Sequence, residues 1–205
     1  EAFNSGEDLH RTMAAMVFGV DPADVTSDER SRIKATSYGL AYGLSAYGLS
    51  AQLQIPVHEA SALRDRYFER FGGVRDYLES LVDQARKDGW TQTICGRRRY
   101  LPDLHSANRT RRDMAERAAL NAPIQGSAAD IVKMAMLDVQ NRLDHSELLS
   151  RMLVQIHDEL LFEVAPGEEE QLRQLVHDGM EGVMKLRVPL EVAIGVGKTW
   201  KDAAH

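Results

Sequence analysis

One stretch of the sequence, Arg30 to Gly43 (RSRIKATSYGLAYG), constrains the fold more than any other. Charged and aromatic side chains recur in it at every fourth position, namely Arg30, Lys34, Tyr38 and Tyr42. On an α-helix this spacing places the four side chains in one slightly drifting row. Thr26 and Glu29 form a T-x-x-E capping box, which predicts that the helix begins just before Arg30.

The chemistry of this row favours a ligand over a packed interior. Lys and Arg are rarely buried without partners, so a row that begins with two cations does not suit a hydrophobic core. It suits a nucleoside triphosphate, because Arg forks onto phosphate oxygens, Lys supplies a mobile charge, and the tyrosines can meet sugar and base. Taken alone, the row is equally compatible with a solvated helix face that carries two tyrosines.

Further helices are predicted on both sides of this row. Residues 5–18 form one, with Ser5 and Asp8 as a capping pair and His10 in the first turn. Its apolar stripe is Leu9, Met13, Met16 and Val17. Three more helices are expected over residues 46–53, 57–71 and 74–88. His10 by itself is more typical of an exposed helix histidine than of a ligand.

A hairpin and a long helix are expected next. Residues 90–102 (WTQTICGRRRYLP) predict two strands that turn near Gly96, and the triple arginine is compatible with a solvated turn. From about residue 108 to 144 the chain is helical, with a kink expected at Pro123. A polar row at four-residue spacing lies on this helix, made of Arg117, Asn121 and Gln125. Such donors suit the DNA minor groove, whose acceptors are similar in all base pairs; the alternative is an ordinary polar helix face.

Residues 151–165 (RMLVQIHDELLFEVA) predict a second hairpin with a tight turn at Asp158-Glu159. Its apolar side chains alternate onto one face, as Met152, Val154 and Ile156. Two carboxylates at such a turn fit Mg²⁺, which is commonly bound by one or two carboxylates and substrate phosphates, although an Asp-Glu turn is usually only a turn. A helix over 167–184 and a strand over 188–196 that pairs with the hairpin complete the prediction.

Three of these motifs together resemble the family A DNA polymerases, the bacterial DNA polymerase I type. The motifs are R-x-x-x-K-x-x-x-Y-G-x-x-Y-G from Arg30, the run from Arg117 to the QGSAAD segment, and His157-Asp158-Glu159, and they follow the family's order. The resemblance implies an α+β fold: mainly helical fingers over residues 1–107 with the hairpin near 90–102, and the C-terminal part of a palm over 108–205, with an antiparallel sheet covered by helices.

The resemblance also implies roles for individual residues. Nucleotide binding falls to His10, Arg30, Lys34, Tyr38 and Tyr42. DNA binding falls to Arg99, Arg117, Asn121, Gln125 and His157. The catalytic residues are Asp158, Glu159 and Lys34, and the metal ligands are Asp158 and Glu159. Tyr38 stands where many bacterial relatives have Phe, and by the family's rule a Tyr here tolerates nucleotides that lack the 3′-hydroxyl.

The activity implied is DNA-directed DNA synthesis in DNA repair and replication, with primer-template DNA and deoxynucleoside triphosphates as partners and two Mg²⁺ ions as cofactors. The family's other metal-binding Asp lies in a D-Y-S-x-I-E-L-R strand shortly upstream of the family segment that matches residues 1–10. We therefore expect this chain to be part of a larger polymerase, without the upstream palm, thumb and nuclease domains, and to be inactive alone. The alternatives are a non-catalytic primer-template-binding module and, less favoured, a metal-dependent nuclease.

Composition sets weaker bounds. The net charge of −6 and pI near 5.7 do not indicate nucleic-acid binding, but the charge is uneven: residues 1–120 hold 17 basic and 17 acidic residues, and residues 121–205 hold 8 and 14. Cys95 is the single cysteine, which excludes a disulfide framework or a cysteine-based zinc site within the chain and favours a reducing compartment. No apolar run reaches membrane-spanning length, and the resemblance to bacterial polymerases implies a cytoplasmic, nucleoid-associated bacterial protein.

Overall fold

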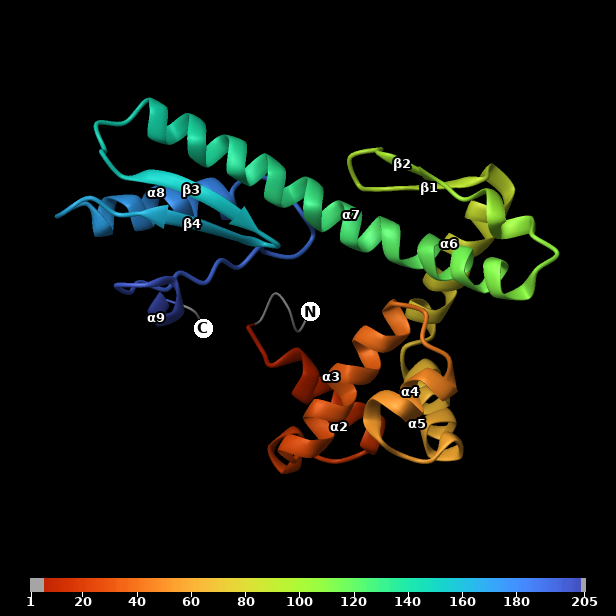
Figure 1. Ribbon diagram of the computed structural model, residues 1–205. Coiled ribbons are helices and arrows are strands. Elements are labelled where there is room, and N and C mark those ends of the chain that lie inside the picture. Colours follow the sequence, from red (N-terminus) through yellow and green to blue (C-terminus); the bar gives the residue numbers. More distant parts are fainter. Residues whose placement is uncertain (1–5, 204–205) are drawn as a thin grey trace. The chain divides into compact units, whose positions relative to one another are not determined.

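The structure is a computed structural model that describes residues 6–203 and separates into two compact units, Glu1–Gly126 and Ser127–His205 (Figure 1). Helices predominate, and the described strands form two separate two-stranded antiparallel sheets. The predicted α+β class is confirmed. The elements of the first unit are α2 (Leu9–Phe18), η1 (Pro22–Asp24), α3 (Ser27–Ala41), α4 (Ala46–Leu53), α5 (Val57–Arg70), α6 (Gly72–Asp88), β1 (Trp90–Gln92), β2 (Arg98–Tyr100), η2 (Pro102–His105) and the first part of α7 (Arg109–Asp144).

Helix α3 begins where the capping box predicts. The Glu29 amide donates to Thr26 Oγ1 at 3.2 Å, and the Thr26 amide donates to Glu29 Oε2 at 2.9 Å. Helix α2 begins at Leu9, later than expected, because Gly6 has a positive φ of 71° that is incompatible with a right-handed helix. Asp8 is the N-cap of α2, and Ser5 lies outside the described residues.

One core of the first unit lies between α2, α3 and α5, and a second one joins α6, η2 and the first part of α7. The fully or nearly buried side chains of the former include Ala14, Val17, Ile33, Leu40, Leu63 and Tyr67. Met16 was expected in the apolar stripe of α2, but it is 44% exposed because Ala14, Ala15 and Val17 form the buried face instead. Since Ile33 and Leu40 fill the inner face of α3, the row of Arg30, Lys34 and Tyr38 is left on the outer face.

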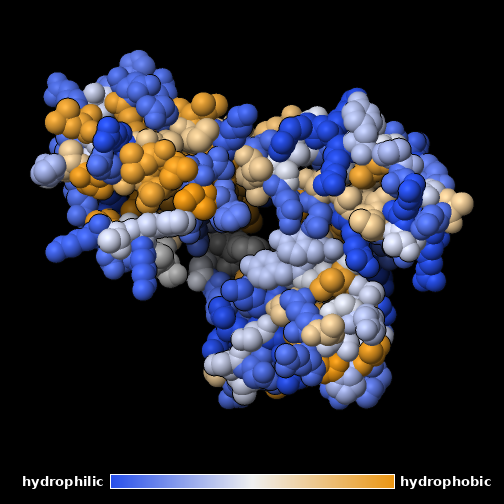
Figure 2. Space-filling model, in the orientation of Figure 1, coloured by the Kyte–Doolittle hydropathy of each residue, from blue (hydrophilic) through white to orange (hydrophobic). Residues whose placement is uncertain are grey.

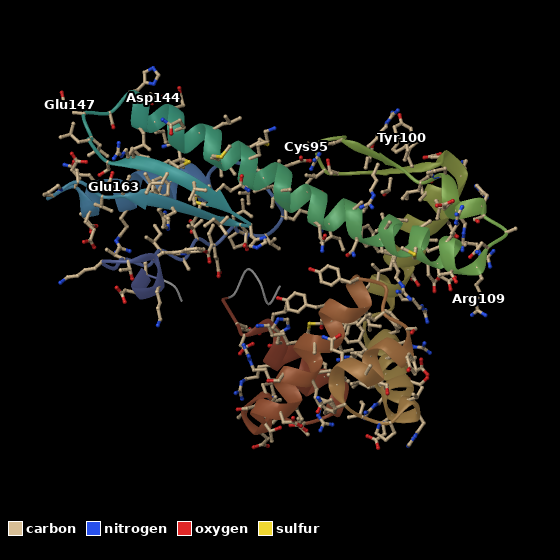
Figure 3. All side chains as sticks on the ribbon, viewed as in Figure 1. Cys95, Tyr100, Arg109, Asp144, Glu147 and Glu163 are labelled. Carbon is tan, nitrogen blue, oxygen red and sulfur yellow. The ribbon has the colours of Figure 1, made fainter. Side chains whose placement is uncertain are left out.

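Strands β1 and β2 form the first predicted hairpin, with Trp90 opposite Tyr100 and a turn at Gly96, whose φ is +81°. Thr91 and Thr93 are buried on one side of it, and Arg97 Nη2 donates to the Gly126 carbonyl at 3.1 Å. The exposed Cys95 lies at the turn, and Tyr100 lies at the base of β2 (Figure 3). The hairpin is therefore attached to α7 at Gly126.

The second unit consists of the rest of α7, β3 (Arg151–Ile156), β4 (Glu159–Glu163), α8 (Glu169–Glu181) and α9 (Trp200–Ala203). Helix α8 lies beside the β3–β4 hairpin (Figure 1). The core joins α7, α8 and the sheet through Val139, Leu143, Leu172 and Val176, with Met152, Phe162 and Ile194 packed against them. The face of the sheet that carries Met152 and Phe162 is therefore covered by helices, as predicted.

Two details of the hairpin prediction were wrong. The two-residue turn is His157-Asp158, and Glu159 is already the first residue of β4. The register shifts between Met152 and Val154, which pair with Phe162 and Leu161. This β-bulge breaks the expected alternation, so Val154 is 44% exposed while Met152 packs in the core.

The predicted strand over residues 188–196 is absent from the described structure. Side chains of α8 hold this segment instead: the Val192 amide donates to Glu181 Oε1 at 3.1 Å, and Arg173 Nη1 donates to the Ile194 carbonyl at 3.4 Å. A cavity of about 770 Å³ is lined both by β4 and by residues 191–199. No ladder with the hairpin forms across that space.

Figure 2 shows apolar side chains gathered on the surface of the second unit. Its exposed large apolar residues include Leu137, Leu149, Leu153 and Val154. Within residues 6–203, none of the helices combines the length and the hydropathy that crossing a bilayer requires.

Candidate functional site

The row on α3 is present as predicted over three helical turns. Arg30 is partly buried, Lys34 is exposed, and Tyr38 is 48% exposed. Tyr42 follows the last helical residue as the C-cap and is 37% exposed. The row therefore presents two cations and two aromatic rings to one side of the unit.

Helix α2 adds His10 to this row. The His10 and Tyr38 rings meet edge to face, with their centroids 5.7 Å apart. Burial lowers the pKa of His10, the charges of Lys34 and Arg30 lower it further, and Asp8 opposes them. The imidazole is thus biased toward its neutral form. Its Nδ1 is buried and has no hydrogen-bond partner among residues 6–203.

Asp8 is the member of this group that the sequence did not suggest beyond helix capping. Arg30 Nε donates to Asp8 Oδ2 at 2.6 Å, and the Arg11 amide donates to Asp8 Oδ1 at 3.1 Å. The bond from Arg30 lowers the pKa of Asp8. Lys34 differs from Arg30, since within the described chain its ammonium group has no bonding partner.

The polar row on α7 lies on one helix face, as the four-residue spacing predicts. Arg117 and Gln125 are exposed, and Asn121 lies between them. Asn121 Oδ1 is buried and has no partner in the described residues, although it sits in the middle of this row. The row therefore offers exposed guanidinium and amide donors at successive turns.

Within the first unit, Gly43 lies where the row on α3 meets the polar row on α7. Its φ is +74°, and a Cβ built on it would lie 2.9 Å from Leu120 Cδ1 and 3.3 Å from Arg117 Cγ. The backbone immediately after Tyr42 therefore packs directly on α7 at Arg117. The Tyr42-Gly43 pair was the sequence signal for this contact, but the packing of Gly43 on α7 was not predicted from it.

Arg99 is exposed on β2, opposite the buried Thr91. The neighbouring arginines have other contacts: the Arg98 guanidinium lies 4.1 Å from the Trp90 ring centroid, and Arg97 bonds to Gly126. Of the three arginines in the GRRRY segment, Arg99 is thus the one that extends from the strand into solvent without such an anchoring contact in the described chain.

His157, Asp158 and Glu159 come together at the β3–β4 turn in the second unit. His157 has a φ of +53°, an unusual conformation for a residue with a bulky side chain. All three side chains are exposed. Glu159 Oε2 accepts a hydrogen bond from Trp200 Nε1 at 3.3 Å, a contact with α9 that the sequence did not suggest.

The carboxylates at this turn fit Mg²⁺ bound mainly by non-protein ligands. Asp158 has no hydrogen-bond or ion-pair partner in the described residues, so both of its oxygens are open. No cluster of three or more metal-ligating side chains occurs among residues 6–203. Mg²⁺ retains several waters and is often held by one or two carboxylates plus phosphate oxygens, so two adjacent carboxylates suit that mode of binding but not a complete protein cage.

Comparison with known proteins gives consistent matches. The family model "DNA polymerase family A" matches residues 1–202. The chain is 62% identical over 205 residues to DNA polymerase I of Mycobacterium tuberculosis (strain ATCC 25618 / H37Rv), covering 100% of this chain and 23% of that protein. It is 46% identical over 203 residues to DNA polymerase I of Geobacillus stearothermophilus, covering 99% and 23%.

A solved structure, the POL domain of Pol1 from M. smegmatis in complex with DNA primer-template and dNTP, matches with a TM-score of 0.94 and 59% identity. The match covers 100% of this chain and 36% of that one. The chain thus spans about a quarter of the length of the curated relatives it matches, 23% for the mycobacterial and Geobacillus enzymes. With a family model that extends over residues 1–202, the chain belongs to DNA polymerase family A.

Proposed function

We propose that this chain is the nucleotide-binding and C-terminal palm portion of a DNA-directed DNA polymerase. Residues 1–107 would be mainly fingers and residues 108–205 the C-terminal part of the palm. The observation that carries the proposal is the group formed by His10, Arg30, Lys34 and Tyr38, which α2 and α3 bring together. Family membership and the relative solved in complex with DNA primer-template and dNTP support it.

In this function the primer 3′-hydroxyl attacks the α-phosphate of a deoxynucleoside triphosphate. A new oxygen–phosphorus bond forms as the hydroxyl loses its proton to solvent, the bond between the α-phosphorus and the bridging oxygen breaks, and pyrophosphate leaves. Arg30, Lys34 and His10 hold the triphosphate, and Lys34 offsets the charge that develops on the pyrophosphate. Tyr38 lies beside the sugar, and Tyr42 lies at the position of the template base.

The remaining residues act on the DNA and the metal. Arg117, Asn121 and Gln125 contact minor-groove acceptors, Arg99 contacts the DNA backbone, and His157 contacts the primer end. Asp158 is the principal Mg²⁺ ligand, and Glu159 is the weaker one. Mg²⁺ ions, when bound, lower the pKa of the attacking hydroxyl and neutralise phosphate charge. We place the protein in the bacterial cytoplasm at the DNA, acting in repair and replication.

The test uses the full-length protein with a primer-template and the complementary nucleotide. Single-nucleotide incorporation is expected, and Asp158→Ala is expected to abolish turnover while leaving the dissociation constant for primer-template unchanged. An accessory DNA-binding module would show no incorporation by the wild type and the same DNA affinity in both forms. That result would replace the polymerase proposal with the non-catalytic one.

A further inference from the structure

The ion pair between Asp8 and Arg30 lies inside the proposed nucleotide site, where a carboxylate is unexpected. The side chains are 39% and 37% exposed, so the pair is open to solvent and to a ligand. A negative charge beside a phosphate-binding arginine has two possible effects. It can compete with the phosphate, or it can fix the arginine in the orientation that the phosphate needs.

The geometry of the pair separates these effects. Asp8 Oδ2 engages Arg30 through Nε at 2.6 Å. Among the described residues, neither Nη group of Arg30 has a hydrogen-bond partner. The guanidinium is planar, so fixing Nε fixes the plane and leaves the two outer N–H groups free to fork onto phosphate oxygens.

Asp8 is itself held firmly enough to orient another side chain. Its Oδ1 accepts from the Arg11 amide at 3.1 Å as the N-cap of α2, and its carbonyl accepts from the Thr12 amide at 2.9 Å. Arg11 in turn donates to the Pro22 and Val25 carbonyls, both at 3.1 Å, which ties α2 to the segment before α3. The carboxylate is therefore anchored to α2 while it holds a side chain of α3.

From these contacts we propose that Asp8 is a positioning residue for nucleotide binding: it aligns the Arg30 guanidinium so that both Nη groups face the triphosphate. This inference rests on the proposed polymerase function and adds a residue to it. It also explains why the N-cap of α2 is Asp rather than Ser or Thr, which cap equally well but cannot reach and charge-pair with an arginine. The bond from Arg30 lowers the pKa of Asp8 further below its ordinary value, so the carboxylate is ionised at neutral pH.

Asp8→Asn is the informative substitution, because Asn retains an oxygen for the Arg11 amide and presents an amide instead of an acceptor to Arg30. In single-nucleotide incorporation by the full-length protein, we expect KM for the nucleotide to rise on the order of fivefold while kcat changes less than about twofold. In an Arg30→Ala background, the same substitution should have no further effect on KM.

Asp28→Asn provides the matched control. It removes an ion pair of similar length on the same helix, Arg32 Nε to Asp28 Oδ2 at 2.8 Å, away from the proposed site. Its KM should equal that of the wild type, and thermal unfolding should show whether either variant is destabilised. An unchanged or lower KM for Asp8→Asn, or a KM effect that persists without Arg30, overturns the positioning role. A wild-type protein that incorporates no nucleotide overturns the polymerase proposal as well.

Discussion

The cationic row on α3 and the carboxylate turn between β3 and β4 are built in different ways. Arg30 and His10 are held by side chains from a second helix, through a 2.6 Å ion pair and a ring contact at 5.7 Å. At the turn, Asp158 has no partner in the described residues, and Glu159 has one bond of 3.3 Å. Arg30 and His10 are thus preorganised by the chain, whereas Lys34 and Asp158 have no such contact in the described residues and depend on what they bind to be held in place.

The largest expected effect comes from the less organised region. Asp158→Ala in the full-length protein should lower kcat by at least about 10³-fold, because the principal metal carboxylate is lost. Glu163→Ala, on the same strand pair and bonded to Arg151 at 2.6 Å, is the control and should retain turnover. Rapid-quench incorporation measures both. An Asp158→Ala enzyme with near-normal kcat would contradict the metal assignment.

Lys34→Ala tests the row on α3 and should have the next largest effect. We expect kcat to fall on the order of 10²-fold, because the role proposed for Lys34 is to offset charge on the departing pyrophosphate. Lys133→Ala, an exposed lysine on α7, serves as the control for charge removal. If Lys34→Ala changed KM alone, Lys34 would be assigned to ground-state binding instead.

Tyr38→Phe tests the sugar side of the row. Tyr38 is 48% exposed, and its ring is held by His10, so the ring should stay in place while the hydroxyl is lost. We expect the substitution to reduce dideoxynucleotide use relative to deoxynucleotide use by about 10- to 100-fold. Competition between the two nucleotides in one reaction measures this ratio, and an unchanged ratio would remove the hypothesis.

The smallest effect concerns stability at low pH near the start of β3. Hydrogen bonds from the Leu149 amide, the Ser150 hydroxyl and the Ser150 amide lower the pKa of Glu168 below its usual 4.5. Stability contributed by such a carboxylate is present above the unfolded pKa and is lost as pH falls through the folded pKa. In urea unfolding experiments, the free energy of unfolding of the wild type should therefore fall more steeply below about pH 4.5 than that of Glu168→Gln. If the free energies of unfolding of the two proteins changed in parallel with pH, these hydrogen bonds would contribute nothing measurable to stability.

Local patterns predicted those parts of the fold that depend on local interactions. The Thr26–Glu29 box and the four-residue spacing located α3, because caps and helical faces are set within a few residues. The site depends on longer-range contacts. Asp8 and Arg30 are 22 residues apart, and their pairing follows from how α2 packs on α3. The family motifs pointed to His10 and Arg30, but the sequence did not indicate an ion pair between Asp8 and Arg30.

The wrong predictions have a common physical cause. Residues 188–196 alternate in the manner of a strand, but a strand also needs a neighbour, and here Glu181 and Arg173 of α8 bond to this backbone instead. Likewise, the β-bulge at Leu153 depends on the pairing of β3 with β4, so the alternation of Met152 and Val154 could not reveal it. The roles of the individual site residues stay predictions until the substitutions are made.

Gly43 limits how the end of α3 can be redesigned. Even a methyl group there would approach Leu120 Cδ1 to 2.9 Å on a backbone whose φ already disfavours any L-side chain. Enlarging residue 43 would therefore push the end of α3, and with it Tyr42, away from Arg117. Engineered or evolved variants of this segment should therefore keep the glycine, or else combine a smaller residue at position 120 with a turn of different geometry after Tyr42.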